Sequence, residues 1–340
     1  MNSRKILFFG LLVLLIIVLA SCAGAAGEPG DPGAAGPAGP PGPKGAAGPA
    51  GTDATLSDLT CTECHNDTSL ISGKQTAWSE SLHGTNESYL RGTSTSCVGC
   101  HSGGGFTTMI AAGLSPNAME AGDPDPTRQD CRTCHQIHTS YTGEDWALAT
   151  TDPVELYALE GATFDGGMGN LCVNCHQPRR GIDDAVDGMI EVTSTHWGPH
   201  HGPQSTMLLG IGGAGDVKGS PSAHASMVED TCVTCHLGEG ASHTFDPDEA
   251  ACQACHADLE DFDLNATQTK VEELAAEVGE LLVAKGLLDE EGHPVVGTYP
   301  EAEAAALWNY ILIVFEDGSS GVHNSSYTEA LLEAAKSALE

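Results

Sequence analysis

Twelve of the 13 cysteines belong to six copies of one five-residue pattern, Cys-x-x-Cys-His. Two thiols at this spacing can each bond one vinyl group of a porphyrin, and the histidine then reaches the iron. The cysteines are Cys61, Cys64, Cys97, Cys100, Cys131, Cys134, Cys172, Cys175, Cys232, Cys235, Cys252 and Cys255, and the histidines are His65, His101, His135, His176, His236 and His256. The pattern predicts six covalently bound haem c groups, each with a proximal histidine.

A single Cys-x-x-Cys pair is also typical of a redox disulfide or of half a zinc site. Neither of these requires a histidine directly after the second cysteine, and here all six pairs have one. The repetition therefore favours haem attachment over both alternatives.

Nine further histidines could supply the second axial ligand of each iron. An iron with two histidine ligands is coordinatively saturated, which suits electron transfer better than substrate chemistry. We predict the distal ligands His83, His138, His200, His224, His243 and His323. His196 and His201 are alternates to His200, and His138 is placed to reach the iron of a neighbouring haem rather than its own. His293 lies in a polar loop and is expected at the surface; no catalytic residue is predicted.

The first 53 residues differ in kind from the rest. Residues 1–21 have the pattern of a signal peptide, with Arg4 and Lys5 before an apolar run. The junction Leu19-Ala20-Ser21-Cys22 resembles the lipobox of bacterial lipoproteins, which implies cleavage before Cys22 and lipidation of that residue. An uncleaved anchor is the alternative, but the apolar run is short for a membrane span. Ala23 at the next position favours the outer membrane.

Residues 22–53 form a predicted stalk, because every third residue from Gly24 onward is glycine and prolines fill both other positions. This period is the collagen signature, since only glycine fits the axis of a triple helix. The segment is either a collagen-like trimer or a semi-rigid spacer on a monomer. In both cases it holds the following domain away from the membrane.

The formal net charge of −34 argues against nucleic acid and anionic lipid as partners. Only 5% of the residues are aromatic, which is thin for a core of this length unless porphyrins supply apolar volume. We predict a mainly α fold with extensive loops and little regular β structure. Residues 54–262 would form the six-haem domain, with short helices beginning at the motifs.

Residues 263–340 are predicted to form a separate helical layer. Val271, Leu274, Val278, Leu281 and Leu282 recur at helical spacing. Two further helices are expected over residues 302–315 and 326–339. These helices either cap the haem core or form a dimer interface.

From about Asp58 onward the chain resembles the multihaem c-type cytochromes of metal- and nitrogen-respiring bacteria, which are related to the ammonia-forming nitrite reductases. The matching stretches are residues 100–106, 196–204, 232–256 and 317–324. The resemblance implies closely stacked haems with mostly bis-histidine ligation, and it supports distal roles for His224, His243 and His323. One departure is that the nitrite reductases carry Cys-x-x-Cys-Lys at the catalytic haem, and no such motif occurs here.

These observations predict a membrane-tethered electron carrier rather than an enzyme. It would be an outer-membrane lipoprotein at the cell surface or on the periplasmic face. Its partners would be other redox proteins, including cytochromes, or extracellular acceptors such as metal oxides. Two alternatives stay open: a reductase of nitrogen or sulfur oxyanions with one open haem, and a subunit of a cytochrome filament.

Overall fold

The computed structural model describes residue 65 and residues 69–200, 202–238 and 240–340. The signal peptide, Cys22, the glycine-repeat stalk, the first motif's two cysteines and His201 lie outside the described residues. Residues 54–340 form one compact unit.

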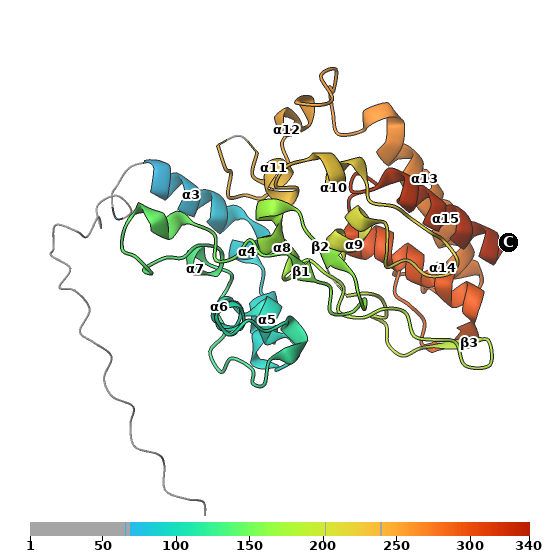
Figure 1. The fold of residues 1–340 in the computed structure, drawn as a ribbon. Coiled ribbons are helices and arrows are strands. Elements are labelled where there is room, and N and C mark those ends of the chain that lie inside the picture. Colours follow the sequence, from blue (N-terminus) through green and yellow to red (C-terminus); the bar gives the residue numbers. More distant parts are fainter. Residues whose placement is uncertain (1–64, 66–68, 201, 239) are drawn as a thin grey trace, which may run out of the picture. The chain divides into compact units, whose positions relative to one another are not determined.

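Helices dominate this unit and strands are few, which confirms the mainly α prediction (Figure 1). Up to residue 262 the elements are short. They are α3 (Ser69–Glu80), α4 (Leu82–Thr85), η2 (Ser88–Thr93), α5 (Val98–His101), α6 (Gly103–Ala112), η3 (Pro116–Ala118), α7 (Cys131–Cys134), η4 (Gly143–Trp146), β1 (Val154–Glu155), β2 (Thr163–Phe164), η5 (Gly167–Gly169), α8 (Asn170–Val173), β3 (Met189–Val192), α9 (Gln204–Leu209), α10 (Ala223–Met227), α11 (Cys232–His236) and α12 (Glu249–Gln253).

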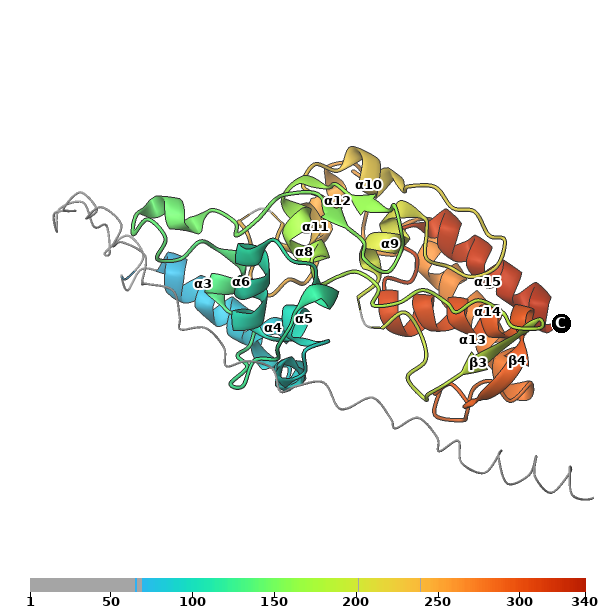
Figure 2. The same cartoon turned by 60° about the horizontal axis from the view of Figure 1, so that its bottom comes forward.

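The remaining elements are longer and more regular. They are η6 (Leu264–Ala266), α13 (Thr267–Ala284), β4 (Gly297–Pro300), α14 (Glu301–Ile311), η7 (Leu312–Asp317) and α15 (Ser325–Leu339). The three expected C-terminal helices are thereby confirmed. Figure 2 shows β3 and β4 as an antiparallel pair, and Ile190 faces Tyr299 in its register.

Each of the five described motifs overlaps a helix of only one turn, namely α5, α7, α8, α11 or α12. Side-chain caps start several of the short helices: Asp130 accepts from the Arg132 N–H at α7, and Asp248 accepts from the Ala250 N–H at α12. After α5, Ser102 caps α6 by accepting from the Gly105 N–H. A Cβ at Gly105 would lie 2.4 Å from Val98 Cγ2, so glycine is what lets α6 fold back onto the second motif.

The largest apolar core joins α13, α14 and α15 to residues from β3 and α9. Val271, Val278 and Leu282 are buried there, as their helical spacing predicts. The ring of Trp308 on α14 meets Trp197 edge-on, with centroids 5.2 Å apart. Within the described residues, no helix combines the length and apolar character needed to cross a membrane.

Candidate haem-binding sites

The structure places a second histidine ring beside each of the six motif histidines. The ring-centroid distances are 6.0 Å for His65–His138 (site 1), 6.2 Å for His101–His200 (site 2), 6.3 Å for His135–His243 (site 3), 6.2 Å for His176–His83 (site 4), 6.4 Å for His236–His323 (site 5) and 6.3 Å for His256–His224 (site 6). The six partners are the six histidines predicted as distal ligands. Of the alternates, His196 lies beside His293 instead, and His201 is outside the described residues.

The common spacing has a simple geometric meaning. A ligating imidazole nitrogen lies about 2.0–2.1 Å from its metal, and the ring centre lies roughly a further 1.2 Å away. Two imidazoles on opposite sides of one metal therefore have centroids roughly 6.4 Å apart. All six pairs have the spacing of two axial ligands on a single iron.

In six of these twelve histidines the Nδ1 atom contacts an acceptor from the protein. The contacts are His135 with Trp146 O (2.7 Å), His176 with Gln204 Oε1 (3.1 Å), His224 with Val322 O (2.8 Å), His236 with Phe245 O (2.9 Å), His243 with Ala241 O (2.8 Å) and His323 with Asp317 Oδ1 (2.7 Å). Because each partner accepts, Nδ1 carries the proton and Nε2 is left as the ligand nitrogen.

Burial lowers the pKa of both histidines of site 4 and so favours their unprotonated form. Desolvation, together with the adjacent His176 ring, lowers the pKa of His83 to about 4. Desolvation also lowers the pKa of His176. A metal-ligating histidine must be unprotonated at the ligand nitrogen, so this environment favours ligation.

Site 5 has a carboxylate behind its distal ring. Burial alone would lower the pKa of His323, but the charge and hydrogen bond of Asp317 raise it above its ordinary value. The Asp317 side chain is almost fully buried. Gln204 connects sites 4 and 5. Its amide oxygen accepts from His176, and its amide nitrogen donates to the carbonyl of Glu316 (2.9 Å), the residue directly before Asp317.

The backbone of His138 is held in an uncommon conformation with φ of 63°. The buried carboxylate of Asp145 stabilises the turn by accepting from the backbone N–H groups of His138 (2.8 Å), Ser140 (2.6 Å) and Tyr141 (3.1 Å). Asp145 therefore fixes the direction in which site 1 receives its second histidine.

Contacts between the motifs themselves show which sites adjoin. Cys175 Sγ (site 4) lies 3.9 Å from the carbonyl oxygen of Cys100 (site 2). Cys232 Sγ (site 5) lies 3.9 Å from the carbonyl oxygen of Gly169, just before the α8 helix of site 4. Site 4 thus touches sites 2 and 5.

Phe245 joins three sites. Its ring centroid lies 4.7 Å from that of His83 (site 4) and 5.9 Å from that of His243 (site 3), while its carbonyl contacts His236 (site 5). Short stretches of chain make the remaining links. His138 of site 1 follows His135 of site 3 by three residues, and Val322, which contacts His224 of site 6, precedes His323 of site 5.

The residues present fit a haem. None of the ten described motif cysteines is in a disulfide, so all ten are available for attachment to a porphyrin. Among the described residues, four buried donors have no protein partner: Arg180 Nε, Trp197 Nε1, Ser205 Oγ and Thr328 Oγ1. Such donors suit the carboxylate of a haem propionate, because a buried polar atom needs a partner.

Residues 50–136 match the family model described as cytochrome c7 and related cytochrome c. The chain is also similar to the crystal structure of the outer cell wall cytochrome OcwA. The TM-score is 0.52 at 24% identity, over 78% of this chain and 50% of that one. The family match supports a multihaem c-type cytochrome. The likeness to OcwA shows the fold, and the chain spans half the length of that cytochrome. No curated protein matches the sequence.

Sequence reasoning assigned no role to the residues that position the ligands. Gln204, Phe245 and Asp317 lie inside the stretches 196–204, 232–256 and 317–324 that carry the family resemblance. Their position in these stretches could have indicated a role near the ligands. Asp145 lies outside the stretches, and its role depends on a turn that no short sequence pattern predicts.

Proposed function

We propose that the chain is an electron-transfer protein with six covalently bound haems, each ligated by two histidines. The six ring pairs carry this proposal, because their spacing of 6.0–6.4 Å is the spacing expected for two imidazoles that ligate one iron from opposite sides. Bound haem supplies one-electron cycling between ferric and ferrous iron. The protein's part is to fill both axial positions, so that no iron is left open to a substrate.

The contacts between sites support a continuous series rather than isolated centres. Sites 1, 3, 4, 5 and 6 adjoin in that order, and site 2 joins the series at site 4. In this arrangement site 4 is the branch point, and sites 1, 2 and 6 are the ends. Electron transfer weakens steeply with distance, so adjoining sites favour passage along the series.

Electron paramagnetic resonance of the oxidised full-length protein tests the ligation. Six bis-histidine irons give only low-spin signals, with six haems per chain by pyridine haemochrome assay. A high-spin signal of one haem per chain would contradict the proposal and favour the reductase with an open haem.

Removal of one distal ligand sharpens the test. His83→Ala should open site 4 and create one high-spin haem, while the other five remain low-spin. Glu80→Gln is the matched control, because Glu80 is an exposed residue at the end of α3, three positions away. If His83→Ala left all six haems low-spin, the assignment of His83 to site 4 would be wrong.

We further propose that the protein acts outside the cytoplasm, held at the outer membrane by lipid on Cys22 and set off by residues 22–53. The lipobox-like junction and the glycine period support this location, as does the similarity to a cytochrome named for the outer cell wall. Its partners would be redox proteins or extracellular acceptors. Cys22→Ala should release the haem protein from the membrane fraction; a variant that stays bound would contradict the lipid anchor.

A further inference from the structure

A seventh histidine pair has the same spacing as the six haem pairs. The rings of His196 and His293 lie 6.3 Å apart, with their planes at 77°. His196 lies between β3 and α9, and His293 lies in the loop between α13 and β4. Neither belongs to a Cys-x-x-Cys-His motif.

The distance distinguishes between kinds of metal site. Two imidazoles on a tetrahedral metal would have centroids roughly 5.2 Å apart, whereas two on opposite sides would be roughly 6.4 Å apart. The observed value fits opposite sides. Two opposed imidazoles leave four positions in the plane between them, and a porphyrin fills those four with its own nitrogens.

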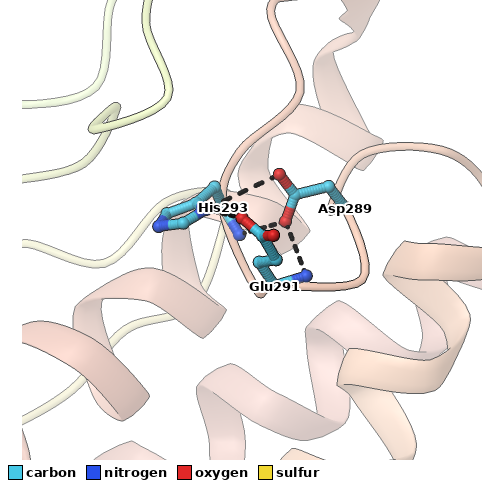
Figure 3. A group of neighbouring side chains, drawn as sticks. All are labelled: Asp289, Glu291 and His293. Carbon is cyan, nitrogen blue, oxygen red and sulfur yellow. Dashed lines mark hydrogen bonds and ion pairs between the residues drawn. The ribbon is translucent and has the colours of Figure 1, made fainter.

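Two carboxylates lie on the Nδ1 side of His293, at longer range than the hydrogen bonds of the haem histidines. Its Nδ1 lies 3.6 Å from Asp289 Oδ2 and 3.7 Å from Glu291 Oε2. Figure 3 shows both carboxylates on one side of the ring, with the second ring nitrogen pointing away from them. Asp289 also fixes the loop, since its Oδ1 accepts from the N–H groups of Glu291 (2.9 Å) and His293 (2.8 Å). Asp317 lies behind His323 as well, at the shorter distance of 2.7 Å.

The nearby surface is more apolar than an exposed loop requires. Phe315 is 49% exposed and Val296 is 57% exposed. A Cβ at Gly292 would lie 3.2 Å from Phe315 Cζ, so this ring adjoins the His293 loop. An apolar disc bound between the two rings would cover these exposed apolar side chains.

We propose that His196 and His293 are the axial ligands of a seventh iron porphyrin, held without covalent bonds. All 13 cysteines are accounted for by the six motifs and Cys22, so this chain has no thiols for a thioether at the seventh site. The inference goes beyond the six-haem proposal and does not depend on it.

The test uses the full-length protein with its covalent haems in place. Acidified butanone extracts porphyrin that is not covalently bound, and the stripped protein is then titrated with haemin. One extractable haem per chain, or saturable binding of one equivalent of haemin, supports the proposal. The covalent haems stay with the protein, so failure of the six-haem assignment is measured separately.

Variants decide whether the two histidines hold the added haem. His196→Ala and His293→Ala should each abolish the one-equivalent binding, while Asp289→Asn should weaken it by about tenfold, as outer ligand partners do. Glu290→Gln, an exposed neighbour in the same loop, is the control. Both histidines are exposed, so an unchanged covalent haem content shows that the variants fold. His293→Met, which keeps a ligand, should retain haemin with a shifted spectrum.

Three results would overturn the proposal. They are the lack of saturable haemin binding, haemin binding unchanged in both alanine variants, and binding of Zn²⁺ alone that needs Asp289 and His293 but not His196. The last result would assign the loop to an inorganic cation.

Discussion

The motif-bearing region before residue 263 and the C-terminal region differ in how much apolar core their own side chains form. The C-terminal helices α13, α14 and α15 pack through their own side chains, and Val278, Leu307 and Leu331 are fully buried among them. The motif-bearing residues before 263 form only two small apolar clusters of their own, one of five buried residues and one of three. The first half has helices of one to three turns joined by loops, and the second has a conventional helical core.

The difference shows where apolar volume comes from in each region. In the smaller cluster, formed by Phe106, Met109 and Leu171, the partly buried cysteines Cys134 and Cys175 pack against the core. Thiols at the edge of an apolar cluster place the porphyrin beside it. We infer that the cofactor supplies the apolar volume of the motif region, as leucine and tryptophan side chains do in the C-terminal region.

The largest expected effect comes from withholding the cofactor. If the full chain is produced where haem cannot be attached, the residues between 69 and 262 that lie outside the C-terminal core should lose their protection from proteases, because two small clusters cannot offset the entropy of ordering the loops. The core of α13–α15 should persist, together with the β3 segment that pairs with β4. Limited proteolysis with mass spectrometry measures this, and equal protection of both regions would break the comparison.

Truncation of a buried side chain should destabilise the C-terminal core and leave the haem sites unchanged. Leu331→Ala removes a fully buried side chain and should lower the free energy of unfolding by about 2–5 kcal/mol. The haem spectrum of the folded protein should stay unchanged, since Leu331 lies in the C-terminal core. Val283→Ala, at a position 43% exposed on α13, is the control and should change stability by about 0.5 kcal/mol or less. Chemical denaturation followed by circular dichroism checks both, and altered haem ligation in Leu331→Ala would show that the regions are not separable.

Sequence reasoning succeeded where a local pattern determines the outcome. The helical spacing from Val271 to Leu282 is local, and the structure confirms α13. The pairing of histidines is not local. His138 is three residues from His135 yet lies against His65, and His83 crosses to His176. Such pairings depend on how the loops fold around the sites, so a sequence supplies the candidates without their partners.

The pair of His196 and His293 illustrates the same limit. His293 has the polar sequence neighbours of a surface residue and is indeed 46% exposed. Only the meeting of two distant loops brings it beside His196, and no spacing along the chain predicts that contact. Gln204 and Asp317, by contrast, lie in the stretches that carry the family resemblance. Their roles as hydrogen-bond acceptors for His176 and His323 could be recognised only from the three-dimensional structure.

A smaller effect is expected where the two regions meet at site 5. Asp317, at the end of η7, accepts a hydrogen bond from His323 Nδ1 and would make that ring a stronger donor to a ferric iron bound at the proposed site. Asp317→Asn should raise the reduction potential of one haem by about 60 mV, which corresponds to a tenfold change in the preference for ferrous iron. Spectroelectrochemical titration measures the six potentials together.

The shift should be confined to one haem, and Glu329→Gln on α15 serves as the control because Glu329 is an acidic residue with no contact to a histidine among the interactions described. If Asp317→Asn moved no potential, the carboxylate would serve only the loop, where it also accepts from Ser319.

The smallest effect concerns the start of α13, at the boundary between the regions. Asp263 accepts from the Thr269 hydroxyl (2.6 Å) and from the N–H groups of Gln268 (2.7 Å) and Thr269 (3.3 Å). The hydrogen bond from the Thr269 side chain is the largest of the interactions that lower its pKa below the ordinary value. Since the folded pKa is depressed, the stabilisation is present above the unfolded pKa of about 3.9 and is lost as the pH falls through the folded value.

Asp263→Ala should therefore lower the thermal midpoint slightly at pH 7, and this difference should vanish as the solution is acidified. Glu260→Ala, at an exposed position three residues earlier, should change the midpoint less at pH 7. A difference for Asp263→Ala that persists in acid would mean that the side chain acts through packing rather than through its charge, and that the boundary is held by the same means as the C-terminal core.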